Sequence, residues 1–355
     1  MKTSILLLTI ATFLPAFAQR HAHLADSIRT AANIPELSYA VISDNDIMEL
    51  YYAGTRKAGS NMPARANDRF RIGSNTKAIT AFMMAHLLQA KGISWQTELH
   101  ELLPELKGQM NPAYTNISLG NLLSLRIPLP AYTYTTTNPD SSHFTGNATE
   151  QRRQFATWLL QQPPSTAEGP LFYTNAGYIV AGLCMERISG KTYEENLADL
   201  NRLLHTRFST GSPNNADNTQ TWGHNANGQP EPPSDNYKFN WLMAAGNINT
   251  TLTDYTKFLQ LQLKAFKGNS NILTIITANY LLFGYDSFAM GWFWERNANQ
   301  HKEAHNIGNP GDFLTAVHII PAVNRGYIVF ANCQTDAAAE AVNYLVSVLK
   351  KDYGE

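Results

Sequence analysis

The sequence has few cysteines and few charged residues, and both shortages restrict its function. Only two cysteines occur in 355 residues, so at most one disulfide can form, and no CxxC pair of the zinc-binding type is present. Charged residues make up 15% of the chain and sum to a net charge of −1, without runs of like charge. Nothing therefore favours nucleic acid or an anionic membrane surface as a partner. The 44% of hydrophobic residues is enough for a sizeable core.

An apolar run stands at the very start of the chain, where residues 1–18 read MKTSILLLTIATFLPAFA. Lys2 supplies a positive start, the apolar run is too short to span a bilayer, and the final AFA has the small-x-small form of a cleavage site. The pattern predicts a signal peptide over residues 1–18 that is cut before Gln19. We therefore expect an exported protein, periplasmic or secreted, with no membrane span after cleavage; a membrane anchor is the weaker alternative.

The two cysteines leave one question open. Cys184 falls in a segment of helical pattern, whereas Cys333 follows an apolar strand pattern. In an oxidising compartment the two thiols would be able to pair. Two separate buried thiols fit the sequence at least as well.

Hydrophobic periodicity places strands near both ends of the chain and helices in the middle. The simplest packing is one antiparallel sheet built from both chain ends and flanked by helices, with an all-α lobe inserted between them, which is an α/β (α+β) fold. The sheet lobe would cover about 19–73 and 285–355, and the helical lobe about 74–284. The expected strands are 37–42, 48–53, 288–294, 313–319 and 327–331, and the expected helices are 22–32, 74–90, 119–125, 151–161, 175–188, 253–265 and 337–349.

A serine and a lysine at the start of one predicted helix form a candidate nucleophile. Gly73 permits a tight turn, Ser74 follows at the helix N-terminus, and Lys77 lies one turn along on the same face. A partly buried lysine loses its proton more readily and can activate a serine hydroxyl. Ser347 and Lys350 have the same spacing, but they lie at the C-terminal end of a helix, the wrong pole for an anionic intermediate.

Three motifs resemble those of the class C β-lactamase and penicillin-binding-protein family. FRIGSNTK, residues 70–77, matches every fixed position of the first motif, F-x-I-G-S-x-T-K. The second motif, Tyr-x-Asn, occurs at Tyr114 and at Tyr173, and only the copy at Tyr173 runs on as AGYIVAGL, as the catalytic copy does in the family. The third motif, Lys-Thr-Gly or His-x-Gly on a strand, corresponds to HNIGNPG beginning at His305.

The resemblance extends from about residue 37 to the C-terminus and implies a β-lactamase-like domain over residues 19–355. It implies a serine hydrolase that acts on an ester, amide or β-lactam through a covalent acyl-Ser74 intermediate. β-Lactamase, esterase and D-amino-acid peptidase activities share the three motifs, so all three stay open. The substrate would be a small molecule or a peptide, with cell-wall-derived peptides among the candidates, and no metal or organic cofactor is implied.

The resemblance also implies roles for individual residues. Tyr173 and Lys77 would share the proton transfers, and positive charge on Lys77 would lower the pKa of the Tyr173 phenol. Asn175 would hold Lys77 and a substrate amide. His305 would orient the substrate or relay a proton.

The oxyanion hole would consist of the backbone N–H groups of Ser74 and Gly308. Ile307 stands where the family usually has glycine, and its branched side chain would narrow the cleft or displace Gly308. Relatives also carry a different segment where this chain has LRIPLP, residues 125–130, and the loop 132–137 that follows either lines the pocket or is merely exposed. These departures keep a second hypothesis open, a non-catalytic ligand-binding or signalling domain on the same fold.

Histidines at positions 301 and 305 have the spacing of metal ligands on a helix. The segment runs directly into GNPG, however, which favours strand or loop structure. We therefore predict no metal site there.

Overall fold

The structure is a computed structural model that describes residues 20–166, 169–215, 218–233 and 237–354. The predicted signal peptide lies outside these residues. Within the described ranges, no helix is both long enough and apolar enough to cross a membrane.

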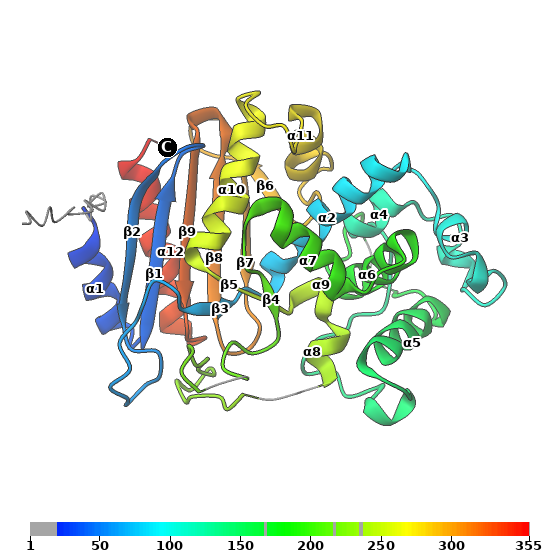
Figure 1. The fold of residues 1–355 in the computed structure, drawn as a ribbon, viewed down its shortest axis with the longest axis horizontal. Helices are drawn as coiled ribbons and strands as arrows, with labels where there is room; N and C mark the ends of the chain where they lie inside the picture. Colours follow the sequence, from blue (N-terminus) through cyan, green and yellow to red (C-terminus); the bar gives the residue numbers. More distant parts are fainter. Residues whose placement is uncertain (1–19, 167–168, 216–217, 234–236, 355) are drawn as a thin grey trace, which may run out of the picture.

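The central feature is a six-stranded antiparallel sheet formed by both ends of the chain (Figure 1). Strand β1 pairs with β2 on one side and with β9 on the other, so that Leu37 lies opposite Ala331. This arrangement confirms the predicted sheet. The strands, in spatial order, are β2 (Ile47–Gly54), β1 (Glu36–Ile42), β9 (Arg325–Ala331), β8 (Leu314–Ile320), β7 (Lys302–Gly308) and β6 (Phe293–Arg296).

One face of the sheet is covered by α1 (Ala22–Ala31) and α12 (Asp336–Asp352), and α10 (Leu252–Phe266) lies across the other face (Figure 1). The residues between the sheet and the α1/α12 layer form one buried cluster, and the second, larger cluster extends into the helical lobe. The central strands β1, β9 and β8 are therefore largely buried, whereas the edge strands β2 and β6 are partly exposed.

The helical lobe packs around the long helix α2 (Thr76–Lys91), which ends at Gly92 in the left-handed conformation, φ 65°, as predicted. The helical lobe also contributes two short strands, β4 and β5, to a second sheet in which β5 pairs with β3 on one side and with β4 on the other, and the periodicity did not indicate this sheet. The further elements are α3 (Leu99–Leu102), α4 (Leu119–Leu123), α5 (Ala148–Gln161), α6 (Ala176–Ser189), α7 (Tyr193–Leu204), α8 (Tyr237–Trp241), α9 (Met243–Gly246), α11 (Ile275–Phe283), β3 (Arg69–Arg71), β4 (Ser209–Thr210), β5 (Ile248–Thr251) and the 3₁₀ turns η1 (Gly73–Asn75), η2 (Pro104–Leu106), η3 (Pro112–Tyr114), η4 (Ser141–His143) and η5 (Pro321–Val323).

The expected strand 288–294 is wrong over most of its length. Phe288 forms only an isolated bridge with Phe293, where β6 begins. Between them the chain turns back at Gly291, whose φ is 86°, and the Ala289 N–H donates to the Trp292 carbonyl at 2.9 Å. A tight turn of this kind needs glycine, and it interrupts an apolar run that otherwise resembles a strand.

The cysteine question is also answered for the described chain. Both thiols are free and buried. Cys184 belongs to the cluster of the helical lobe and Cys333 to the cluster beneath α12, so they are separate core residues.

Two carboxyl groups lie together inside the sheet lobe. Glu36 is fully buried beside Asp68, and Arg56 is 3.5 Å from the Asp68 carboxylate. Burial raises the pKa of Glu36 well above 4.5, and the neighbouring Asp68 raises it further. The pair therefore favours a protonated Glu36.

Candidate active site

The predicted nucleophile lies in a turn that only glycine can make. Gly73 has φ 49°, and a Cβ built on it would lie 2.6 Å from the backbone nitrogen of Asn309. The 3₁₀ turn η1 then leads directly into α2, which puts Ser74 at the N-terminal end of the helix. The free N–H groups and the dipole of that end favour a developing anion.

Two further predicted residues converge on the Ser74 hydroxyl. The Nζ of Lys77 is 3.1 Å from the Ser74 Oγ, and the Tyr173 hydroxyl is 3.0 Å from the same oxygen. Lys77 comes from the next turn of the chain, whereas Tyr173 comes from the loop before α6. The serine oxygen therefore has two groups within reach that can carry a proton.

Lys77 is fully buried and surrounded by acceptors. Besides Ser74, its Nζ donates to the Oδ1 of Asn175 at 2.8 Å and to the backbone carbonyl of Ala245 at 2.9 Å. Burial lowers the pKa of Lys77 to about 7. As an ammonium group it can donate to all three partners; as a neutral amine it can donate to the two carbonyl oxygens and accept from the serine.

The net shift of the Tyr173 pKa is opposite to the lowering expected from Lys77. Although 45% of the surface of Tyr173 is exposed, the protein packed around the residue desolvates the phenol and raises the pKa of Tyr173 above 10.0. The hydrogen bond with Ser74 opposes the shift only in part. Because Lys77 gives up its proton near neutral pH, it supplies little positive charge to stabilise a phenolate.

Asn175 links the second motif to the loop over residues 132–137. Its Oδ1 accepts from Lys77, as predicted, and its Nδ2 donates to the carbonyl of Tyr132 at 2.9 Å. Tyr132 is buried, whereas Thr133 and Thr135 of the same loop are exposed. Part of this loop thus supports the site and part of it is only surface.

The segment 125–130 holds the other end of the second motif. The Phe172 N–H donates to the Leu125 carbonyl at 2.8 Å, and the Thr174 hydroxyl donates to the Pro130 carbonyl at 3.3 Å. These bonds flank Tyr173 on both sides. The altered sequence of the segment therefore still fixes the tyrosine.

The third motif forms β7, and its end lies directly against the nucleophile turn. A Cβ built on Gly308 would lie 1.9 Å from the Ile72 carbonyl oxygen, so this position requires glycine. Ile307 pairs with Ala316 without any irregularity of the ladder, and 45% of its surface is exposed. Gly308 is therefore not displaced, and the isoleucine projects away from the turn.

Asn306 is a functional residue that the sequence interpretation missed. Its Nδ2 donates to the Ser74 carbonyl at 3.1 Å and to the Gly291 carbonyl at 2.9 Å. The side chain thereby ties β7 to the nucleophile turn and to the turn before β6. In the sequence, only the position of Asn306 inside the third motif pointed to a role for this residue.

His305 lies half-buried in a stack of rings. Its ring is stacked on Phe293, with centroids 6.1 Å apart, and on His318, with centroids 5.4 Å apart. Burial lowers the pKa of His305, and the charge of His318 lowers it further. Over the described ranges no hydrogen bond joins His305 to Ser74, Lys77 or Tyr173, so its role toward a substrate stays a prediction.

An ion pair beside the nucleophile was also missed. Arg71 of β3 donates to the Oδ1 of Asp312 at 2.9 Å and to the hydroxyl of Tyr134 at 3.2 Å, and its guanidinium lies 3.9 Å from the ring centre of Phe239. Asp312 follows the third motif and Arg71 precedes Ser74. The pair therefore fastens two of the motifs to each other.

The alternative matches to the motifs are structural. Ser347 donates to the carbonyl of Tyr344, and Lys350 lies 2.8 Å from both carboxylate oxygens of Glu303. Tyr114, from the unused Tyr-x-Asn copy, is fully buried in the core. These contacts assign the second serine–lysine pair and the second tyrosine to packing.

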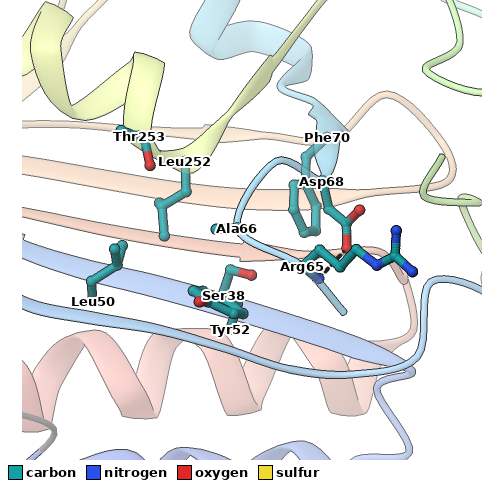
Figure 2. A pocket seen from close by; sticks show the side chains of 9 residues that line it. All are labelled: Ser38, Leu50, Tyr52, Arg65, Ala66, Asp68, Phe70, Leu252 and Thr253. Carbon is teal, nitrogen blue, oxygen red and sulfur yellow. Dashed lines mark hydrogen bonds between the residues drawn. The ribbon is translucent and has the colours of Figure 1, made fainter. Parts of the chain in front are cut away.

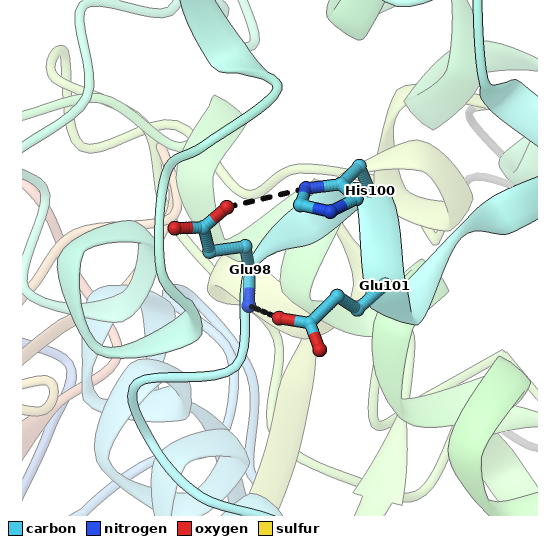
Figure 3. Close-up of side chains that lie close together, drawn as sticks. All are labelled: Glu98, His100 and Glu101. Carbon is cyan, nitrogen blue, oxygen red and sulfur yellow. Dashed lines mark hydrogen bonds and ion pairs between the residues drawn. The ribbon is translucent and has the colours of Figure 1, made fainter.

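A cavity and a cluster of side chains elsewhere do not compete with this site. The cavity beside Asp68 has a volume of about 10 Å³, which holds at most one water molecule (Figure 2). Of the described His, Cys, Asp and Glu side chains, only Glu98, His100 and Glu101 are close enough together to hold a metal ion (Figure 3). Glu101 accepts from the Glu98 N–H and the Glu98 carboxylate pairs with His100, which is the arrangement of a helix cap.

Comparison with known proteins agrees with this geometry. The β-lactamase family model matches residues 21–349. The chain belongs to the β-lactamase family, which is a family of serine hydrolases.

Individual relatives are distant. Protein flp of Staphylococcus aureus is 22% identical over 329 residues, which span 88% of this chain but only 62% of that protein. Penicillin-binding protein 4 of Amycolatopsis lactamdurans is 24% identical over 186 residues, half of this chain and 46% of the relative.

Solved structures share the fold at low identity. D-amino acid amidase from Ochrobactrum anthropi SV3 superposes with a TM-score of 0.73 at 18% identity, covering 94% of this chain and 99% of the amidase. A class C β-lactamase from Rhodobacter sphaeroides superposes with a TM-score of 0.72 at 16% identity, covering 93% of this chain and all of the enzyme. These superpositions confirm the predicted fold.

Proposed function

We propose that the protein is an exported serine hydrolase that cleaves an ester or amide bond through an acyl-Ser74 intermediate. The observation that carries the proposal is the pair of hydrogen bonds, 3.1 Å from Lys77 and 3.0 Å from Tyr173, that meet at one serine oxygen at a helix N-terminus. A binding module has no use for a buried amine and a phenol directed at the same hydroxyl. Export is proposed from the pattern of residues 1–18 alone.

In acylation, neutral Lys77 takes the proton of the Ser74 hydroxyl as Oγ bonds to the substrate carbonyl carbon. The carbonyl oxygen gains the negative charge, which the N–H groups of Ser74 and Gly308 stabilise together with the helix dipole. As the bond to the leaving group breaks, the Tyr173 hydroxyl gives that group a proton. Tyr173 then regains its proton from the Lys77 ammonium, so the protons balance.

Deacylation uses the same residues with water as the nucleophile. Water bonds to the acyl carbon as its proton passes to neutral Lys77. The bond between the acyl carbon and the Ser74 oxygen breaks, the Tyr173 hydroxyl gives that oxygen a proton, and the Lys77 ammonium then returns a proton to Tyr173. The geometry alone does not choose among esters, peptides and β-lactams. A cell-wall-derived peptide remains one proposed substrate because export would expose the protein to it.

The experiment is turnover of 4-nitrophenyl butyrate by the chain from Gln19 onward, beside Ser74→Ala. We expect a burst of nitrophenol followed by slower turnover, and mass spectrometry of the quenched protein should find the added butyryl group on the peptide that contains Ser74. Ser347→Ala is the matched control, because Ser347 has the same spacing to a lysine and should leave the rate unchanged. Equal rates for wild type and Ser74→Ala would leave the ligand-binding alternative.

A further inference from the structure

Two exposed apolar side chains belong to the motifs of the candidate active site. Among the described residues, six large hydrophobic side chains are exposed, and two of them, Tyr173 and Ile307, belong to the second and third motifs with 45% of their surfaces exposed. Exposed apolar surface at a catalytic centre marks the side on which a ligand rests. The six residues are Tyr52, Tyr173, Ile275, Ile276, Ile307 and Tyr344.

Aromatic rings pack against Tyr173 and continue this apolar surface. Phe293 is stacked on the Tyr173 ring, with centroids 5.3 Å apart and planes at 26°. Phe288 meets both rings edge-on, at 5.7 Å from Tyr173 and 4.9 Å from Phe293, and is itself fully buried. We call Tyr173 and Phe293, with Phe288 packed against both of them, the aromatic shelf.

Phe293 occupies the position between Tyr173 and His305. It stacks on the first at 5.3 Å and on the second at 6.1 Å, and the three rings are within 26° of parallel at each contact. In the sheet Phe293 lies directly opposite His305, where the pairing of β6 with β7 ends. Phe293 therefore separates the His305 ring from the Tyr173 ring.

The charged groups near the shelf are neutral or already engaged. His305 lies between Phe293 and His318, and both burial and the second histidine lower its pKa. Lys77 has a pKa of about 7 and faces three acceptors inside the protein. Arg126 approaches Phe288, but its guanidinium donates to three backbone carbonyls. A carboxylate on the shelf would meet apolar rings instead of a cation, and desolvating it there is costly.

We propose that Phe293 is the specificity-determining residue of the proposed hydrolase and that it selects esters whose acyl chain is uncharged and apolar. The acyl chain lies on the aromatic shelf while its carbonyl carbon faces Ser74. Acyl chains that end in a carboxylate are rejected because Phe293 and the Phe288 ring beside it offer the carboxylate neither a cation nor a hydrogen-bond donor. This inference rests on the proposed function and adds the substrate class.

The test compares two esters with the same leaving group and acyl chains of similar length, 4-nitrophenyl butyrate and 4-nitrophenyl hemisuccinate. We expect wild type to favour the butyrate at least about tenfold in kcat/KM. Phe293→Ser replaces the apolar ring by a hydroxyl that can donate to a carboxylate and uncovers the His305 ring, so it should bring the ratio close to one. Phe293→Leu is the matched control, because it keeps an apolar side chain and should keep the preference.

Equal kcat/KM values for the two esters in wild type would overturn this inference and leave the proposed function standing. The inference also fails if Phe293→Ser folds and keeps the wild-type ratio of the two kcat/KM values. The proposed function would still stand in that case. If neither ester is hydrolysed and no butyryl group is found on Ser74, the proposed function fails and this inference fails with it. If Phe293→Ser does not fold, the ratio of the two kcat/KM values in wild type still tests whether the protein prefers the apolar acyl chain.

Discussion

The pH profile of turnover should report the protonation of Lys77, and one substitution should move it. Lys77 must be neutral to accept the Ser74 proton, and its pKa is about 7. kcat/KM should therefore rise with pH up to about 7 and then level off. At pH 5 only about one lysine in a hundred is neutral, so we expect activity about 100-fold below the plateau.

Asn175→Asp places a carboxylate where an amide oxygen now lies 2.8 Å from the Lys77 Nζ. An opposite charge at this distance favours the ammonium form and shifts a pKa by about 1–3 units, here upward. The rise in kcat/KM should then move to higher pH by the same amount, and activity at pH 7 should fall about 5- to 500-fold while the high-pH plateau is largely kept.

The assay is the pH dependence of kcat/KM for 4-nitrophenyl butyrate between pH 5 and 10. Asn299→Asp is the control, because it adds the same charge in the exposed turn between β6 and β7 and should leave the profile unchanged. A wild-type profile that is flat from pH 5 to 8, or an Asn175→Asp profile that rises at the wild-type pH, would refute the role of Lys77 as the base.

Three further predictions follow from single contacts. Gly308→Ala would place a Cβ 1.9 Å from the Ile72 carbonyl oxygen, so β7 must shift and kcat should fall at least about 100-fold, measured on folded protein by circular dichroism. Asn306→Asp replaces the amide group that donates to two backbone carbonyls, so we expect a lower kcat with little change in KM. If the substitution only reduced the amount of folded protein, the active-site titre would fall and the kcat of the remaining sites would stay the same. Glu36 has a pKa raised well above 4.5, so its protonated form stabilises the fold at acid pH and this contribution is lost as the pH rises above 4.5 toward the raised pKa. In Glu36→Gln the melting temperature should therefore decline less steeply with rising pH than in wild type. Thermal melts with an unchanged slope would contradict a raised pKa of Glu36 beside Asp68.

The sequence predicted the parts of the site that local structure determines. Gly73, Ser74 and Lys77 lie within one turn of each other, so the spacing alone brought the amine to the hydroxyl. The family motifs then identified Tyr173 and Asn175, and the structure brings both of them to the same place.

The contacts that the sequence could not predict depend on tertiary packing. The carbonyl of Ala245 carries no side-chain signal, yet it is one of the three acceptors of Lys77. The position of Phe293 between Tyr173 and His305 depends on where β6 begins, which the turn at Gly291 decides. The sign of the Tyr173 shift depended on burial, which composition does not reveal.

The helices and strands also divide into those that the local sequence predicted and those that it did not. Long apolar runs predicted the strands of the large sheet, but β5 (Ile248–Thr251) reads INTT and has too little apolar alternation to stand out. Helix α7 was overlooked although its first turn carries a capping box, Thr192 with Glu195, which was available as a signal.

The pairing of β1 with β9 has a consequence for the order in which the protein becomes active. Leu37 pairs with Ala331, and the end of β7 packs against the turn before Ser74. The candidate site is therefore completed by contacts between residues far apart in the sequence. A growing chain already holds Ser74 and Lys77 while it still lacks Gly308. If the proposed function holds, the unfinished or unfolded polypeptide should be inert, and we expect hydrolysis only after the whole chain has folded.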